Sequence, residues 1–205
     1  MTSSEFRKRL GQLQEVIMRG LAYYAVWSRL RLHDQGRVSW SIEEQNELLG
    51  RWRGFFTPVS LALMDMALMQ FAKAFDTDSR TASLPVLLSA AKQDGRLIPR
   101  GAPPELAAVS AKVQRSSATL ATLKQLRNQQ LAHVDANPGW ISPLKSQKIE
   151  SLAEDVKSAF NFLSTAHDGR FFSWNPLLRQ TDEQTTEILR VLLEEMGRKQ
   201  KEHEE

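Results

Sequence analysis

The chain has 205 residues, of which 25% are charged and 41% hydrophobic, and its formal net charge is +3. This length suits one domain with a substantial core, and the composition is ordinary for a globular protein. The absence of cysteine excludes disulfide bonds and thiolate metal sites. A positive charge this mild does not by itself indicate nucleic-acid binding.

Apolar periodicity and capping signals predict helices along the whole chain and no strand. The predicted helices cover residues 2–32, 41–52, 58–75, 83–92, 105–133, 142–165 and 181–196. Gly54 and Pro58 are expected to interrupt the chain before the third of these helices, and Thr181 to cap the last one. The charged tail, residues 197–205, is expected to fray. The sequence therefore predicts an all-α bundle of about five to seven helices, forming a single domain over residues 1–205.

Residues 58–75 form the most apolar segment, which we place at the centre of the bundle because it is apolar nearly all round. Its length could suggest a membrane helix, but Asp65, Gln70 and Lys73 argue against one. A carboxylate in so apolar a helix must be hydrogen-bonded or paired, and Asp65 is such a carboxylate. Since there is no signal peptide either, we expect a cytoplasmic protein that does not interact with membranes.

The predicted helix at 105–133 carries two rows of residues at intervals of seven, which together form one seam on its surface. These rows are Leu106, Val113, Leu120 and Arg127, and Val109, Ser116, Leu123 and Gln130. The seam begins apolar and ends with Arg127 and Gln130, and His133 lies one turn further on. A charge on a packing seam is costly unless a partner pairs with it.

Two interpretations of this polar end are open. In the structural one, Arg127 pairs with a buried acid and His133 caps the last carbonyls of its helix. In the functional one, both side chains face a shared groove. On one helix they stand about 9 Å apart along the axis and about 120° apart around it. With this separation, the two side chains of one helix are poorly placed to act on the same phosphate. A copy of the helix across a two-fold axis would bring each Arg127 towards the other chain's His133.

The stretch Arg127-Asn128-Gln129-Gln130-Leu131-Ala132-His133 resembles the Arg-x(4–6)-His motif of the HEPN superfamily, including the polar residue straight after the arginine. Three further stretches resemble the abortive-infection, AbiU-like branch of that superfamily. They are Asp135-x-x-Pro138, the run from Leu68 to Asp76 and the run from Ser83 to Leu88. The resemblance extends over residues 55–162.

This resemblance implies a helical bundle that dimerises through the motif helices and, in active members, acts as a metal-independent endoribonuclease. His133 would be the general base or acid, Arg127 would bind the scissile phosphate, and Asn128 would orient either group. We expect Asp65 or Asp135 to orient Arg127, with Gln130 also supporting the site. Some relatives carry a modifiable tyrosine where this chain has Asp135, so we do not predict that modification.

The function predicted is RNA cleavage that leaves a 2′,3′-cyclic phosphate, in phage defence or as a toxin. No metal or cofactor is expected. The expected partners are RNA, a second copy of the chain and a cognate antitoxin or sensor protein. A catalytically silent helical module that binds a protein or nucleotide, and a purely structural interaction protein, are the alternatives.

Seven basic positions could form an RNA footprint, although ordinary solvated helix faces explain them equally well. They are Arg7, Lys8, Arg9, Arg29, Arg31, Arg51 and Arg53. The tryptophans could stack on bases, but in a helical bundle we expect most of them to be core anchors.

Overall fold

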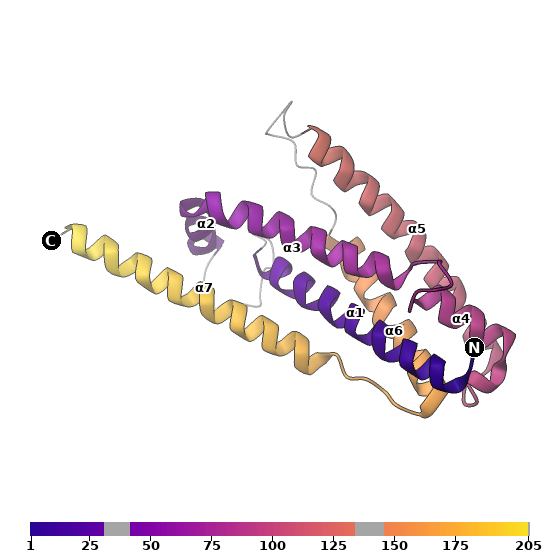
Figure 1. Cartoon of the computed structure of the whole chain (residues 1–205). Coiled ribbons are helices and arrows are strands. Elements are labelled where there is room, and N and C mark those ends of the chain that lie inside the picture. Colours follow the sequence, from indigo (N-terminus) through magenta and orange to yellow (C-terminus); the bar gives the residue numbers. More distant parts are fainter. Residues whose placement is uncertain (31–41, 134–145, 205) are drawn as a thin grey trace. The chain divides into compact units, whose positions relative to one another are not determined.

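A computed structural model describes residues 1–30, 42–133 and 146–204, and these contain seven α-helices, one 3₁₀ helix and no strand (Figure 1). The all-α prediction is confirmed. The elements are α1 (Ser3–Arg29), α2 (Ile42–Arg51), α3 (Arg53–Ala74), α4 (Leu84–Gln93), η1 (Gly95–Leu97), α5 (Pro103–His133), α6 (Ser146–Asp168) and α7 (Asn175–Glu204).

The first helix begins where its capping signal predicts. The backbone N–H of Glu5 donates to the hydroxyl of Thr2 at 3.2 Å, which satisfies one of the free amides of the first turn. The Glu5 carboxylate accepts from Arg9 one turn later, at 2.8 Å. An N-cap and an ion pair at the i, i+4 spacing therefore both stabilise this end of α1.

Helix α3 begins at Arg53 and includes Pro58, so the predicted interruption at Gly54 and Pro58 is wrong. The amides of Phe55 and Phe56 donate to the carbonyl of Trp52, at 2.9 and 3.0 Å, and start the helix before the proline. Pro58 stands in the second turn, where it removes only the bond to the carbonyl of Gly54. Gly54 is exposed, so water can satisfy that carbonyl.

Among the described helices, α3 is the one long and apolar enough to cross a membrane, by length and composition only. The core helix of a soluble protein passes the same test. The expectation of no membrane span therefore stays a prediction.

Helix α7 begins at Asn175, well before the predicted cap at Thr181, so that boundary was also wrong. Pro176 fits the first turn because an amide there needs no helical partner. The hydroxyl of Thr181 instead donates back to the carbonyl of Leu177 at 3.0 Å, inside the helix. Helix α7 continues to Glu204, and the fraying of its charged end stays a prediction.

The described chain divides into two compact units, to which α1 and α3 each contribute residues. The first unit comprises residues 1–19 and 68–173, and the second comprises residues 20–67 and 174–205. This division does not decide whether the units fold separately, so the single-domain expectation stays a prediction.

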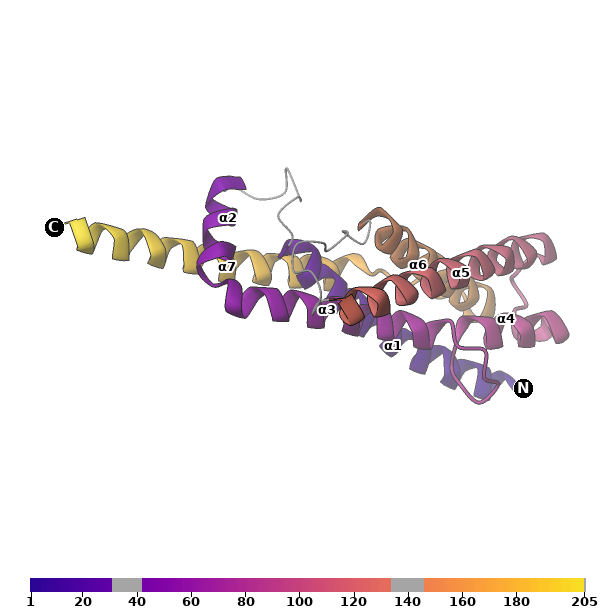
Figure 2. The same ribbon diagram turned by 90° about the horizontal axis from the view of Figure 1, so that it is seen from above.

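In the first unit, α5 packs against α6 and α4 (Figure 2). Leu106, Val113 and Leu120 of α5 are 7%, 3% and 4% exposed, which confirms the apolar part of the predicted seam. Helix α6 contributes its own buried row to this core. That row is Ile149, Leu152, Val156, Phe160 and Leu163.

The C-terminal end of α6 is fastened to the segment that precedes α5. Nδ1 of the buried His167 lies 2.5 Å from the carbonyl oxygen of Leu97, and the amide of Arg100 donates to the carbonyl of Ala166 at 3.0 Å. Gly169 follows the helix with a φ of +80°, and a Cβ there would overlap the Arg100 guanidinium. The positive φ therefore favours glycine at this end of α6, whereas the exposed Arg100 side chain could move away from a Cβ.

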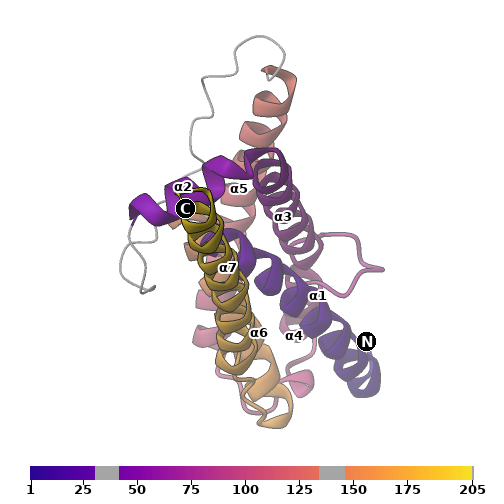
Figure 3. The same ribbon diagram turned by 90° about the vertical axis from the view of Figure 1, so that its left-hand side faces the viewer.

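In the second unit, α2 packs against α7 (Figure 3), and a small core forms around buried Leu48, Phe56 and Leu189. Trp27 and Trp174 are buried here too, as expected for core anchors. Arg29 of α1, only 6% exposed, forms a two-pronged ion pair with the carboxylate of Asp182 of α7.

Replacing Asp182 with alanine should destabilise the protein, because it removes the carboxylate that neutralises a buried guanidinium. Breaking a buried pair costs about 3–5 kcal/mol, and we expect about 2–4 kcal/mol here, since the Asp182 side chain is 36% exposed. Urea unfolding followed by circular dichroism measures the change.

The adjacent Glu183→Ala is the matched control, because Glu183 pairs with Arg179 in solvent and its loss should cost less than about 0.5 kcal/mol. Equal effects of the two substitutions would show that burial of Arg29 does not depend on Asp182.

Gly169→Ala should destabilise the first unit by about 1–2 kcal/mol, because alanine disfavours a positive φ. Gly11→Ala is the control, since a Cβ at this position in α1 meets no atom within 4 Å. It should be neutral or stabilising by up to about 1 kcal/mol. Thermal unfolding of both variants checks the prediction, which an unchanged Gly169→Ala protein would contradict.

Candidate functional site

The residues expected to carry chemistry lie in the last two turns of α5. The backbone is helical through Arg127, Asn128, Gln130 and His133. Their side chains, and Asp135 altogether, lie outside the described residues. The structure thus supports the helical spacing on which the prediction depends, while the roles of these side chains stay predictions.

That spacing separates Arg127 from His133 by about 9 Å along the helix and by about 120° around it. Arg127 also stands at the position that extends the row of Leu106, Val113 and Leu120, all of which are buried. An ideal helix drifts by only about 20° over each interval of seven residues, so the row keeps nearly the same face. The position of Arg127 therefore continues the packing face of α5.

Polar contacts between α5 and α6 show how far the two helices run alongside each other. The hydroxyl of Ser116 donates to Asp155 at 2.6 Å, and Nζ of Lys112 lies 3.5 Å from the hydroxyl of Ser158. From the first contact to the second, the residue number decreases along α5 and increases along α6, so the helices are antiparallel. The same register places Ser146, where α6 begins, level with Gln125. The described part of α6 therefore does not extend alongside residues 127–133.

Asp65, one of the two residues expected to orient Arg127, lies half-buried in the part of α3 that belongs to the second unit. Arg127 belongs to the first unit. Their pairing stays a prediction.

The candidate RNA footprint is smaller in the structure than in the sequence. Arg29 is committed to Asp182, and Arg9 donates to the carbonyls of Ser79 and Thr81, at 2.7 and 3.2 Å. The other described members are exposed cations, namely Arg7, Lys8, Arg51 and Arg53. Arg31 lies outside the described residues. Arg9 and Arg29 therefore have structural partners, and the RNA footprint stays a prediction.

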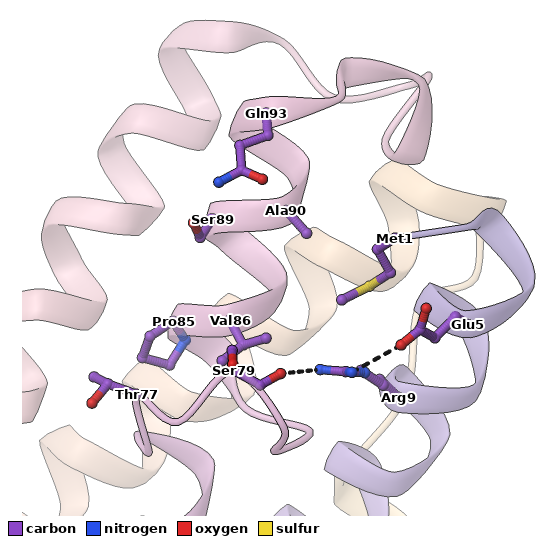
Figure 4. A pocket seen from close by; sticks show the side chains of 10 residues that line it. All are labelled: Met1, Glu5, Arg9, Thr77, Ser79, Pro85, Val86, Ser89, Ala90 and Gln93. Atoms are coloured by element: carbon purple, nitrogen blue, oxygen red, sulfur yellow. Dashed lines mark hydrogen bonds and ion pairs between the residues drawn. The ribbon is translucent and has the colours of Figure 1, made fainter.

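A cavity of about 550 Å³ lies between α1 and α4, and none of the described side chains of α5 lines it (Figure 4). Its charged side chains are Glu5 and Arg9, which pair with each other at 2.8 Å. Pro85, Val86 and Ala90 supply apolar lining from α4. The charges of these two side chains, Glu5 and Arg9, offset one another.

Hydrogen bonds from arginines lower the pKa of several exposed carboxyls. Arg80 lowers the pKa of Asp78, and Arg96 lowers that of Asp94. The two members of each pair are two positions apart in the sequence and lie at the surface, so these pKa shifts reflect local ion pairs. Within the described part of the chain, no group of three or more His, Asp or Glu side chains could hold a metal ion.

Sequence reasoning missed Asp155, which contacts both Ser116 and Lys112 of α5. Ser116 was the available signal, because a hydroxyl on an apolar seam requires a polar partner. The sequence does not show which helix provides that partner.

The family model HEPN_AbiU2, described as AbiU2, matches residues 3–186 of the chain. Comparisons with curated proteins and with solved structures found no match. The match extends from the first turn of α1 into α7 and includes the complete helix that carries Arg127 and His133. The chain belongs to the AbiU2 family of HEPN proteins.

Proposed function

We propose that this protein is a metal-independent endoribonuclease of the HEPN type, acting in the cytoplasm in phage defence or as a toxin. The observation that carries the proposal is the placement of Arg127 and His133 on one continuous helix of an AbiU2-family chain. Arginine and histidine are suited to a phosphodiester, since one binds phosphate and the other transfers protons near neutral pH.

In the proposed reaction, His133 removes the proton from a ribose 2′-hydroxyl, and the 2′-oxygen attacks the adjacent phosphorus. The bond from phosphorus to the 5′-oxygen breaks, and that oxygen leaves as a hydroxyl after receiving a proton from water, while His133 later releases its proton to the solvent. The products are a 2′,3′-cyclic phosphate and a free 5′-hydroxyl. Arg127 stabilises the negative charge that develops on the phosphoryl oxygens. Asn128 orients the phosphate or His133, with Gln130 and Asp65 or Asp135 supporting the site.

The proposed active assembly is a homodimer in which the ends of two α5 helices meet. Two observations support it. Arg127 and His133 stand on different sides of one helix, and the described part of α6 begins level with Gln125, before either residue. A two-fold axis would bring Arg127 of each chain near His133 of its mate and so form one composite site. A cognate antitoxin or sensor protein would restrain the activity in the host.

Purified protein should cleave a mixed RNA pool in EDTA and leave cyclic-phosphate ends. Arg127→Ala and His133→Ala should each lower the rate at least about 100-fold, as expected when a transition-state contact or a general base is lost. Gel electrophoresis with end-group analysis measures both the rate and the product.

Arg115→Ala is the matched control, because Arg115 is an exposed arginine on the same helix and its loss should leave the rate nearly unchanged. Equal cleavage by all four proteins would indicate a contaminant or another site. Absence of cleavage by the unmodified protein would favour a silent module that binds a protein or nucleotide.

The stability of Arg127→Ala separates the catalytic role from a structural ion-pair clamp. Loss of a buried clamp should cost about 3–5 kcal/mol, whereas loss of a catalytic side chain often leaves stability equal or higher. We expect the free energy of unfolding to change by less than about 1 kcal/mol. Urea unfolding measures it, and a loss as large as that of Asp182→Ala would favour the clamp.

A further inference from the structure

A polar cluster interrupts the apolar contact between α5 and α6. The hydroxyl of Ser116, which is only 3% exposed, donates to Oδ2 of Asp155 at 2.6 Å. The other carboxylate oxygen, Oδ1, lies 2.9 Å from Nζ of Lys112. Lys112 and Ser116 stand one turn apart on α5, so the single carboxylate of α6 contacts two successive turns of its neighbour.

The apolar residues around this cluster specify the relative position of the two helices only weakly. On α5, Leu106, Val109 and Val113 follow one another at intervals of three and four residues. A slide of α5 by one turn would therefore replace one aliphatic contact with another.

The polar cluster, unlike the apolar contacts, favours one register of α5 on α6. If α5 moved by one turn, only one of the two α5 partners, Ser116 or Lys112, could still reach the Asp155 carboxylate. The Ser116 hydroxyl would keep an acceptor in its own helix, the Lys112 carbonyl 3.0 Å away. The carboxylate, which is 22% exposed, has a partner for both of its oxygens only in the observed register. A single polar contact in an apolar helix seam is known to define register in this way.

We propose that Asp155 is a positioning residue that sets the register of α5 on α6 and thereby the location of residues 127–133. Ser116 and Arg127 stand on the same helix, so an axial shift at one is transmitted to the other. Displacements of about 1 Å from the reactive geometry can lower a rate about 100-fold. The catalytic consequence rests on the proposed function, whereas the register itself does not.

The register can be measured directly with spin labels on introduced cysteines, because the chain contains no cysteine of its own that would also be labelled. Ala121→Cys on α5 and Gln147→Cys on α6 place spin labels at two exposed positions. Electron paramagnetic resonance should give one narrow distance distribution in the otherwise unmodified protein. Asp155→Ala should broaden it or add a population displaced by about one helical turn, 5.4 Å. Asp155→Asn should remain narrow, because its amide oxygen still accepts from Ser116.

Glu154→Gln is the matched control. Glu154 precedes Asp155, is exposed and pairs within α6 with Lys157, so this variant should keep the narrow distribution. Ser116→Ala removes one of the two α5 partners of Asp155 and leaves Lys112, so it should broaden the distribution in the same way but to a smaller extent. It also provides a second test if Asp155→Ala does not fold. An unchanged distribution in both alanine variants would overturn the register role.

Steady-state RNA cleavage tests the catalytic consequence. Asp155→Ala should lower kcat at least about tenfold with KM changed less than about twofold, because bound RNA would meet a displaced site. Asp155→Asn should recover most of the rate. A shifted distance distribution with an unchanged kcat would overturn the positioning role. If the unmodified protein cleaves no RNA, the proposed function fails, and the distances alone decide whether Asp155 sets the register.

Discussion

The antiparallel contact between α5 and α6 determines where the ends of both helices lie in the first unit. Its apolar part buries Leu106, Val113 and Leu120, which supplies stability but little positional information. Its polar part, Ser116 with Asp155, supplies the position. Burial explains why these helices associate, whereas hydrogen-bond satisfaction explains why they associate in one register.

The second unit shows the same division between apolar and polar contacts. Leu48, Phe56 and Leu189 form a small core, and the ion pair of Arg29 with Asp182 joins α1 to α7 beside it. A planar guanidinium bound by both carboxylate oxygens constrains orientation as well as distance. The arginine is nearly fully buried, so this contact has a structural role and cannot also serve as a surface for RNA.

Periodicity was sufficient to predict the fold class, the apolar seam of α5 and the helical placement of Arg127 and His133, because these depend on residues within one helix. Boundaries were less predictable. Pro58 and Thr181 are typical of helix ends, yet the structure places both inside helices. Contacts between helices were unpredictable in principle. Nothing in the sequence pairs Ser116 with Asp155, because any polar residue on a neighbouring helix could satisfy that hydroxyl.

Helix geometry also limits how the proposed site could work. One α5 is poorly placed to direct Arg127 and His133 at the same phosphate, because about 120° of rotation separates them. Two copies related by a two-fold axis would remove this conflict, since Arg127 of each chain would approach His133 of its mate in one composite site. The interface and the site would then be the same surface. Any displacement of α5 along α6 would move Arg127 and His133 together, so contacts remote from the RNA would affect dimerisation and catalysis at once.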